Sequence, residues 1–446
     1  MIFSSNIFLF LFFPIILICY FLVHKLSRGT TPSNLTLIIL SLLFYLWGNG
    51  SWYLLIFLLS ILVNYFFGHL LNLHQNKKLT LGIGIGINVA LLAYFKLLLL
   101  LSPHSILPIG VSFYTFMAIS FLIDTYRVNV HSISPLKFAT YLSLFPHIVA
   151  GPIVRYNEIE KEIEKRIINT GGIFNGFVRF SYGLGKKVII ANNLAFVVDK
   201  IYAIPISELS FGLAWIGVLA FAFQIYYDFS GYSDMAIGLA HIFGFHFPEN
   251  FDNPYRARSV TEFWRKWHIS LSSWLRDYVY IPLGGSRKGN FRTYLHIFIV
   301  FLLCGMWHGL AFTFILWGMY QAIIIVIERY LKNRYHFSAQ NRLFIIPTFI
   351  LVASGWVLFR STSLDFAFSY IRILFSLNNP LFISRYYHLR YYLPTNSQFI
   401  LILAFYLSFF TQPKIHNKFI IGISAIGVLL YSASGYEPSQ LYHRVN

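Results

Sequence analysis

The sequence contains few charged residues and almost no cysteine. Only 11% of its residues are charged, whereas a soluble domain carries about a quarter. This composition excludes an ordinary water-soluble globular fold. The two cysteines, Cys19 and Cys304, lie in separate apolar runs, which excludes a disulfide framework and a CxxC metal or redox motif. In their place the chain has 57% hydrophobic residues over 446 positions, which predicts a polytopic membrane protein.

Acidic residues are also scarce, and the formal net charge is +18. The lysines and arginines lie in short segments between apolar runs, so they fit the positive-inside rule better than a nucleic-acid-binding surface. The first apolar run lacks the basic start and small-residue cleavage site of a signal peptide. We therefore expect it to be a retained span, with His24, Lys25 and Arg28 on the inner side.

The apolar runs predict one all-α domain over residues 1–446, with about 10–12 membrane segments plus short re-entrant and interfacial pieces. No internal repeat or appended soluble domain is visible. The expected spans cover residues 1–23, 35–71 as a hairpin broken at 48–51, 79–101, 109–123, 173–198, 211–227, 232–247, 294–327, 343–359, 399–410 and 419–432.

Two segments depart from this simple pattern. Residues 145–152 carry two prolines and a glycine in an apolar context, which predicts a re-entrant segment lining a cavity in place of a continuous helix. Residues 155–167 alternate charged and apolar side chains, which predicts a helix lying at the inner membrane surface.

His308 is the sharpest candidate for chemistry, because it lies in the apolar run FLLCGMWHGLAFTFILWG with no charged neighbour. Ionisable side chains kept in such runs are functional candidates, and a neutral imidazole can act as a general base. An ordinary core histidine, hydrogen-bonded to a carbonyl or hydroxyl, explains the pattern equally well. Cys304 would share a helix face with His308 and could carry an acyl group, although packing is the favoured interpretation of a lone cysteine.

His268 lies in the basic and aromatic stretch between Asn253 and Arg292, which we expect to include an amphipathic helix at the inner leaflet. Any single cation there is more simply a solvated or headgroup-facing side chain. The whole set, with few acids among them, would suit a polyanionic cytosolic donor such as coenzyme A. Its cations are Arg256, Arg258, Arg265, Lys266, Arg276, Arg287, Lys288 and Arg292.

Two carboxylates, Asp228 and Asp234, lie between two predicted apolar helices. They could pair with arginines of the basic stretch, or they could mark a helix break. Structural pairing is favoured over catalysis, because a single general base needs no carboxylate pair. The turn at Gly284–Arg287 is a weak candidate for a phosphate cradle and is more simply a tight surface turn.

Several long motifs resemble the bacterial membrane-bound O-acyltransferase (MBOAT) family, and within it the alginate O-acetylase-like subfamily. The similarity covers nearly the whole chain. Its motifs are the start MIFSSNIFLFLFFP, residues 107–116, 145–152 and 226–287, the box Met306-Trp307-His308-Gly309, and residues 355–360.

This resemblance implies acyl transfer from a cytosolic thioester, with acetyl-CoA as the expected donor, to hydroxyls of an extracytoplasmic glycan or to a partner acetyltransferase. It implies catalytic roles for His308 and His268, which meet in a tunnel through the membrane, and no bound cofactor or metal. The expected partner is an extracytoplasmic glycan-modifying protein such as an SGNH-type acetyltransferase, and the expected location is the bacterial cytoplasmic (inner) membrane. Donor-binding or tunnel roles are expected for Trp264, Arg265, Trp267, Arg276, Asp277, Trp307, Asp228 and Asp234. The polar end GYEPSQLYHRVN departs from the family pattern.

Three alternatives remain open. D-alanyl transfer to teichoic acid uses the same Trp-His-Gly box, although residues 280–285 fit the alginate-type subfamily better. A transporter or flippase would explain the spans without chemistry, but it predicts paired half-repeats that are not visible. A di-iron oxygenase needs closely spaced histidines, whereas His241, His246, His268, His296 and His308 are scattered.

Overall fold

The computed structural model describes residues 2–27, 29–73, 76–102, 107–128, 134–336, 341–376 and 388–410. These residues form helices joined by short connections and contain no strand. Eight of the helices are long and apolar enough to cross a membrane. The chain is thus an all-α, multi-pass membrane protein, as the composition predicts. The total of about 10–12 segments stays a prediction, because the expected span over 419–432 lies outside the described residues.

Most long apolar runs form the expected helices. The break at 48–51 is confirmed, because α2 ends at Asn49 and α3 begins at Ser51. Gly50 turns the chain there with a φ of 86°, a conformation that favours glycine. The eight candidate spans are η1 with α1 (Phe8–Leu26), α2 (Thr30–Asn49), α3 (Ser51–Leu73), α4 (Lys77–Leu101), α11 (Phe211–Ile242), α14 (Asn290–His308), α15 (Phe312–Tyr335) and η5 with α16 (Arg342–Arg360).

Two predicted span boundaries are wrong. Residues 211–227 and 232–247 were expected to form two helices, but α11 is continuous from Phe211 to Ile242. Its polar positions need no break, because their side chains are paired with basic residues in the same unit. Residues 294–327 were expected to be one span, but they divide into α14 and α15. The separating residues 309–311 are apolar themselves, so hydropathy alone could not reveal the turn.

The chain forms two compact units, each described here by itself. The first contains the described residues up to Leu184 together with Tyr232–Glu249; the second contains Gly185–Gly231 and the described residues from Asn250 onward. This division leaves the expectation of one domain over residues 1–446 as a prediction.

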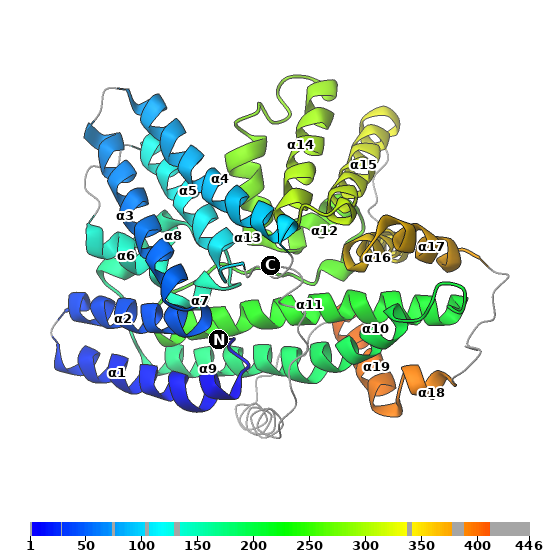
Figure 1. The fold of residues 1–446 in the computed structure, drawn as a ribbon, viewed down its shortest axis with the longest axis horizontal. Coiled ribbons are helices and arrows are strands. Elements are labelled where there is room, and N and C mark those ends of the chain that lie inside the picture. Colours follow the sequence, from blue (N-terminus) through cyan, green and yellow to red (C-terminus); the bar gives the residue numbers. More distant parts are fainter. Residues whose placement is uncertain are drawn as a thin grey trace. The chain divides into compact units, whose positions relative to one another are not determined.

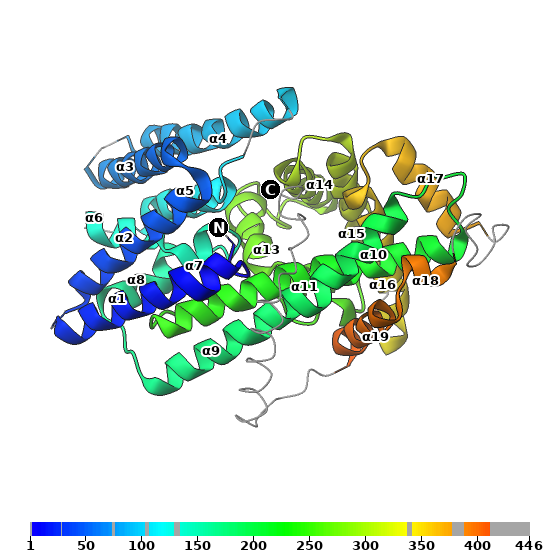
Figure 2. The same cartoon turned by 60° about the horizontal axis from the view of Figure 1, so that its bottom comes forward.

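In the first unit α1 packs against α2, and α3 and α4 pack against each other and against α5 (Val111–Val128), as Figures 1 and 2 show. Residues 145–152 do not form a continuous helix, as predicted, because α7 spans only Phe145–Ile148. Its re-entrant position stays a prediction. The charged segment does form a helix, α8 (Tyr156–Glu164), whose Ile159 and Ile163 are buried. Its place at the membrane surface also stays a prediction. The remaining elements of this unit are α6 (Pro135–Ser143) and α9 (Thr170–Gly185).

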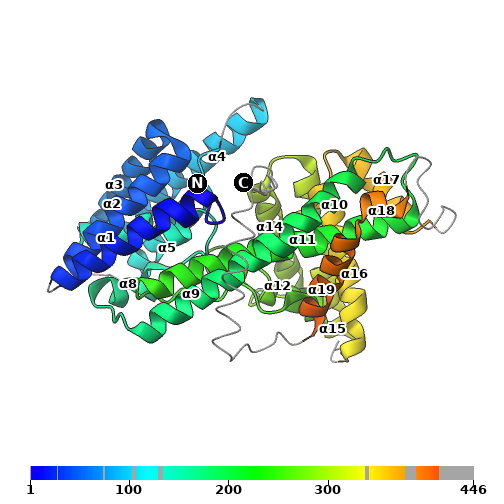
Figure 3. The ribbon, with the colours of Figure 1, turned by 90° about the horizontal axis from the view of Figure 1, so that it is seen from below.

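In the second unit α14 and α15 pack against each other as a hairpin. The helix α19 (Thr395–Phe409) lies beside α10 (Asn192–Tyr202) (Figure 3). The hairpin crosses at Gly305 and Gly318. A Cβ on Gly318 would lie 2.3 Å from the Phe301 carbonyl oxygen, so only glycine permits this approach. The unit also contains η2 (Lys186–Ala191), η3 (Pro254–Arg256), α12 (Val260–Lys266), α13 (Ile269–Leu275), η4 (Arg276–Tyr280), α17 (Leu364–Leu374) and α18 (Leu389–Tyr392).

Candidate active site

His268 lies at a sharp break in the second unit. The predicted helix does form after His268, as α13 followed directly by η4 (Arg276–Tyr280). It is not continuous with the preceding residues, because α12 ends at Lys266 and α13 begins at Ile269. His268 has a left-handed backbone, with a φ of 44°. Such a conformation costs a non-glycine residue about 1–3 kcal/mol and persists only where surrounding contacts impose it. The break turns the His268 ring inward, where only 2% of the residue is exposed.

Asn250 provides those contacts. Its side-chain oxygen lies 3.2 Å from His268 Nδ1 and accepts hydrogen bonds from the Ser270 backbone N–H (3.2 Å) and hydroxyl (2.9 Å). Its backbone oxygen accepts a hydrogen bond from the Ile269 N–H at 2.9 Å. The edge of the ring packs against Phe229, with the ring centroids 4.6 Å apart. The position and orientation of His268 are therefore fixed from several sides.

Burial also sets the charge of this histidine. Removal from water lowers the pKa of His268 to about 3, because desolvation penalises the charged form of an imidazole. The ring is therefore neutral at physiological pH, and its unprotonated nitrogen can accept a hydrogen bond.

His308 is the last residue of α14 and is half-buried. Gly309 follows with an extended backbone and ends the helix. The imidazole of His308 is surrounded by aromatic rings: Trp317 at 5.2 Å and Phe359 at 5.0 Å meet it edge-on, and Trp307 lies 4.4 Å away. These rings give the His308 imidazole a largely apolar setting.

Trp307 brings the two predicted catalytic histidines into one cluster. Its ring centroid lies 6.2 Å from that of His268 and 4.4 Å from that of His308. The two imidazoles come from segments forty positions apart in the sequence, and their centroids are separated by no more than the sum of these two distances. His268, Trp307 and His308 are referred to below as the histidine cluster.

Trp264 and Trp267 pack against further aromatic rings of the second unit. Trp264 donates a hydrogen bond from its indole N–H to Gln321 Oε1 at 3.2 Å, and its ring lies 5.8 Å from Trp317. Trp267 packs 5.0 Å from Trp356. Both indoles are buried. They support the site through packing, and their expected role in donor binding stays a prediction.

Arg276 and Asp277 pair with each other. The Arg276 side chain donates to both carboxylate oxygens of Asp277, at 2.7 and 3.1 Å. Both residues lie in η4, the π-helical turn Arg276–Tyr280. They belong to the same unit as the histidine cluster, and their expected role stays a prediction.

The two carboxylates of α11 are paired, but with partners other than those expected. Asp228 pairs with Lys187 of η2, and both side chains are buried. Asp234 pairs with Arg179 of α9 at 2.5 Å, and Arg179 also binds Glu249 through two hydrogen bonds. The expectation of pairing is met. The expected arginine partners from the stretch 253–292 and the expected helix break are both wrong. A buried carboxylate in a membrane helix needs the nearest available cation, and other helices supply it.

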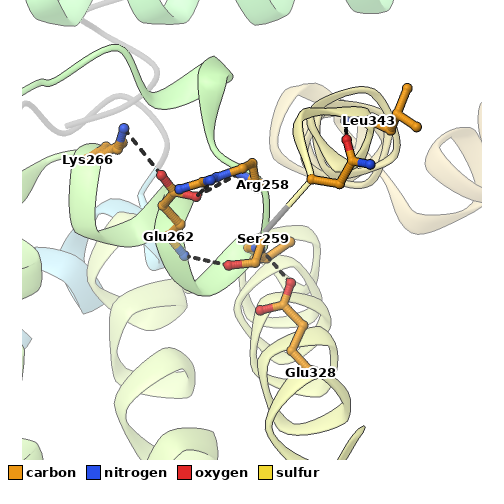
Figure 4. Close-up of polar contacts among 8 residues, drawn as sticks. Arg258, Ser259, Glu262, Lys266, Glu328 and Leu343 are labelled. Carbon is orange, nitrogen blue, oxygen red and sulfur yellow. Dashed lines mark hydrogen bonds and ion pairs between the residues drawn. The ribbon is translucent and has the colours of Figure 1, made fainter. Parts of the chain in front are cut away.

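A cavity of about 700 Å³ lies in the second unit, bounded by α12, α15 and α16. It is lined by Arg258, Arg265, Glu262, Glu328, Arg329 and Lys332, among others. Glu328 accepts hydrogen bonds from the Val260 and Thr261 backbone N–H groups at the start of α12 (Figure 4). These are donors that a helix end leaves unpaired.

The second acid of the cavity is also engaged. Glu262 lies between Arg258 and Lys266, at 3.4 and 3.3 Å (Figure 4). Burial opposes its ionisation, but the Arg258 backbone N–H and the charge of Lys266 prevail and lower the pKa of Glu262. Arg265, Arg329 and Lys332 form no ion pair with any residue that the structure describes. The cavity can therefore attract an anion.

Cys304 is buried and lies on α14 one turn before His308. No group of three or more His, Cys, Asp or Glu side chains within the described ranges could hold a metal ion. The di-iron alternative therefore has no visible ligand set in that part of the chain.

Some residues of the site escaped sequence reasoning. Asn250 gave no signal of its own, because a single asparagine ahead of a loop has many explanations. Trp317 and Phe359 lie in apolar runs, where aromatic residues are common. Phe359 does fall within the motif at 355–360, and that motif was the available clue.

Residues 8–371 match the model of the membrane-bound O-acyltransferase family. The chain is 41% identical to a probable alginate O-acetylase of Pseudomonas putida, over 85% of this chain and 81% of the relative. It is 35% identical to a peptidoglycan O-acetyltransferase of Helicobacter pylori, over 85% and 80%. It is 30% identical to a teichoic acid D-alanyltransferase of Bacillus subtilis, over 58% and 70%.

Proposed function

Because the chain belongs to the membrane-bound O-acyltransferase family and is therefore an O-acyltransferase, we propose that it transfers acetyl groups to hydroxyls of an extracytoplasmic glycan. The observation that carries this proposal is the histidine cluster, in which the imidazoles of His268 and His308 both lie close to the Trp307 indole. The names of the relatives with 41% and 35% identity, an alginate O-acetylase and a peptidoglycan O-acetyltransferase, support acetyl as the acyl group.

In the proposed reaction His308 is the general base. Its imidazole takes the proton of the acceptor hydroxyl as the oxygen attacks the thioester carbonyl. The tetrahedral intermediate then collapses, the carbon–sulfur bond breaks, and the proton passes to the departing thiolate. Both substrates must be held together for this step, and binding them in one cluster replaces a slow encounter in solution.

The acyl donor is a cytosolic thioester, for which acetyl-CoA is the proposed compound. Phosphate groups favour arginine and lysine side chains. The cavity beside α12 offers Arg265, Arg329 and Lys332, while its carboxylates are occupied by internal contacts. This cavity belongs to the same compact unit as the histidine cluster. We assign the phosphates of the donor to it.

We further propose that the protein lies in the bacterial cytoplasmic membrane. Its acetyl group would pass to the glycan directly or through an extracytoplasmic glycan-modifying protein, such as an SGNH-type acetyltransferase. The multi-pass fold and the basic inner segments support this arrangement.

A deletion strain tests the proposal. Each envelope glycan is isolated from the deletion strain and from strains complemented with the wild-type gene or with His308→Ala. Alkali-labile acetyl esters are then quantified by mass analysis. We expect one glycan to lose its acetyl esters in the deletion and in the His308→Ala strain. Unchanged acetylation of every envelope glycan would refute the proposal.

The second candidate is D-alanyl transfer, which the teichoic acid D-alanyltransferase relative supports. The same mass analysis separates the two functions, because an alanyl ester and an acetyl ester add different masses. Loss of alanyl esters with intact acetyl esters would replace the proposed activity by this one.

A further inference from the structure

The histidine cluster contains a buried polar atom without a hydrogen-bond partner among the described residues. This atom is Nε2 of His268, on a residue that is only 2% exposed. An unsatisfied buried polar group costs about 1–3 kcal/mol. Native proteins keep few such groups, and each one calls for an explanation.

The state of this atom follows from the orientation of the Asn250 amide. A backbone N–H can only donate, so the Ser270 N–H at 3.2 Å identifies the Asn250 atom facing it as the oxygen. The Ser270 hydroxyl donates to the same oxygen at 2.9 Å. The backbone contact excludes the flipped amide, because the NH₂ group would then face a second N–H donor.

The tautomer of His268 follows in turn. Its Nδ1 lies 3.2 Å from this Asn250 oxygen and must be the donor, so the proton of the neutral ring is on Nδ1. Nε2 then carries a lone pair and no proton. It can accept a hydrogen bond but cannot donate one.

The surrounding backbone holds this arrangement in place. The Ile269 N–H donates to the Asn250 carbonyl oxygen at 2.9 Å, and the Asp252 N–H donates to the Lys266 carbonyl oxygen at 3.0 Å. These bonds tie the segment that begins at Asn250 to the break that carries His268. Backbone hydrogen bonds before and after His268 in the chain therefore hold its left-handed conformation.

We propose that Asn250 is a positioning residue that fixes His268 in the Nδ1–H tautomer, and that His268 Nε2 accepts a hydrogen bond from a second hydroxyl of the acceptor glycan. The attacking hydroxyl has a single proton, and His308 takes it. This inference rests on the proposed acyl transfer and deepens it. A hydroxyl supplies a donor, which a bare Nε2 requires. A thioester carbonyl supplies only an acceptor, so a bare Nε2 cannot polarise it. His268 is thereby assigned to the acceptor substrate.

The tautomer is measured first, without reference to activity. The full chain is labelled with ¹⁵N-histidine, placed in lipid bilayers, and studied by solid-state NMR at neutral pH. The His268 signals are identified by subtracting the spectrum of His268→Gln. We expect a protonated Nδ1 and an unprotonated Nε2 in the wild type, and a loss of this preference in Asn250→Leu. A protonated Nε2 in the wild type would overturn the proposal.

The kinetic assay uses membrane vesicles of producing cells, labelled acetyl-CoA and the de-O-acetylated envelope glycan as probes. We expect Asn250→Leu to lower kcat/KM for the glycan by up to about 100-fold, since a small misplacement of a group that orients the substrate costs a rate of this order. The KM for acetyl-CoA should stay within about twofold of the wild-type value. Asn250→Asp keeps the acceptor oxygen and should retain the Nδ1–H tautomer and most of the rate. An effect of Asn250→Leu on acetyl-CoA alone would refute the assignment to the hydroxyl.

Asn64→Leu is the matched control. Asn64 is also buried and exchanges side-chain hydrogen bonds with Asn88, but it lies in the other compact unit. Its replacement should leave the His268 signals and the KM for the glycan unchanged. If Asn64→Leu reproduced the kinetic effect, general destabilisation would explain it and the positioning role would be refuted. If the chain proved not to be an acetyltransferase, the NMR result on the tautomer would still stand or fall by itself.

Discussion

The Arg179 cluster of the first unit and the histidine cluster of the second use buried polar groups in opposite ways. In the Arg179 cluster, Asp234 is only 7% exposed and is neutralised by the guanidinium, which also binds Glu249. In the histidine cluster, His268 is equally buried but has one bonded nitrogen and one without a partner among the described residues. Charged groups that are fully paired stabilise the fold. A buried nitrogen that is held in place without a hydrogen-bond partner can bind a substrate.

The comparison teaches where function resides in this chain. Glu249 and Asn250 are neighbours in the sequence, yet one completes an ion-pair cluster and the other orients a histidine. Substitutions in the Arg179 cluster should change stability, and substitutions in the histidine cluster should change the rate. Variants of both clusters separate an effect on stability from an effect on rate.

His308→Ala should have the largest effect. Loss of a general base lowers the rate by about 10²–10⁴-fold, while the aromatic rings around the site can keep the fold. Acetyl transfer in membrane vesicles measures the rate, and the amount of protein in the membrane provides the control. Full activity at equal protein level would remove His308 from the mechanism.

Arg179→Met should destabilise the fold by about 2–4 kcal/mol, because Asp234 would remain buried and charged without its partner. Since the Arg179 side chain is 31% exposed, water moderates the loss. Thermal unfolding in detergent measures the effect, and the double variant Arg179→Met with Asp234→Asn should recover most of it. Glu249→Gln, at a carboxylate that is 57% exposed, should cost less than about 1 kcal/mol. Equal losses for both single variants would contradict the assigned roles.

Stability should fall as the medium is acidified. The pKa of His268 is lowered from 6.5 to about 3 in the folded state, so only the unfolded chain takes up this proton between those values. The contribution is complete above pH 6.5 and declines as the pH falls toward 3, by about 2 kcal/mol at pH 5. Unfolding temperatures at pH 7.5 and pH 5 should differ less in His268→Gln than in the wild type. An identical difference in both proteins would show that His268 does not titrate in this way.

Neutralising the cavity should weaken donor binding. The double variant Arg265→Gln with Arg329→Gln should raise the KM for acetyl-CoA by about tenfold with little change in kcat, because charge-assisted contacts to phosphate would be lost. Arg334→Gln, on the same helix α15 but outside the cavity lining, is the matched control. If the control raised the KM equally, a general loss of positive charge would explain the result, and the cavity would lose its assignment.

Cys304→Ala should have the smallest effect. The thiol is buried in α14, where it fills space against its neighbours, so we expect unchanged activity and a small loss of thermal stability. A large loss of acetyl transfer at normal protein level would instead favour an acyl-enzyme intermediate on this thiol.

Composition and hydropathy by themselves determined the class of this protein. Apolar runs as long as a bilayer is thick must form helices that satisfy their own backbone hydrogen bonds, which predicted most of the long helices. The motifs around His308 and His268 indicated the family and predicted both histidines as catalytic residues. Hydropathy failed where a turn was apolar, as at residues 309–311, and where polar residues stayed inside a helix, as along α11.

Only the tertiary structure decided which side chains meet. Asp234 could have paired with any of 34 lysines and arginines, and packing selected Arg179. The approach of Trp307 to His268 and the contact of Asn250 with His268 join residues that are distant in the sequence. Sequence patterns record periodicity along one helix, whereas contacts of this kind depend on how separate helices and loops pack together. The tautomer of His268, and with it the proposed role of that residue, is therefore a property of the fold.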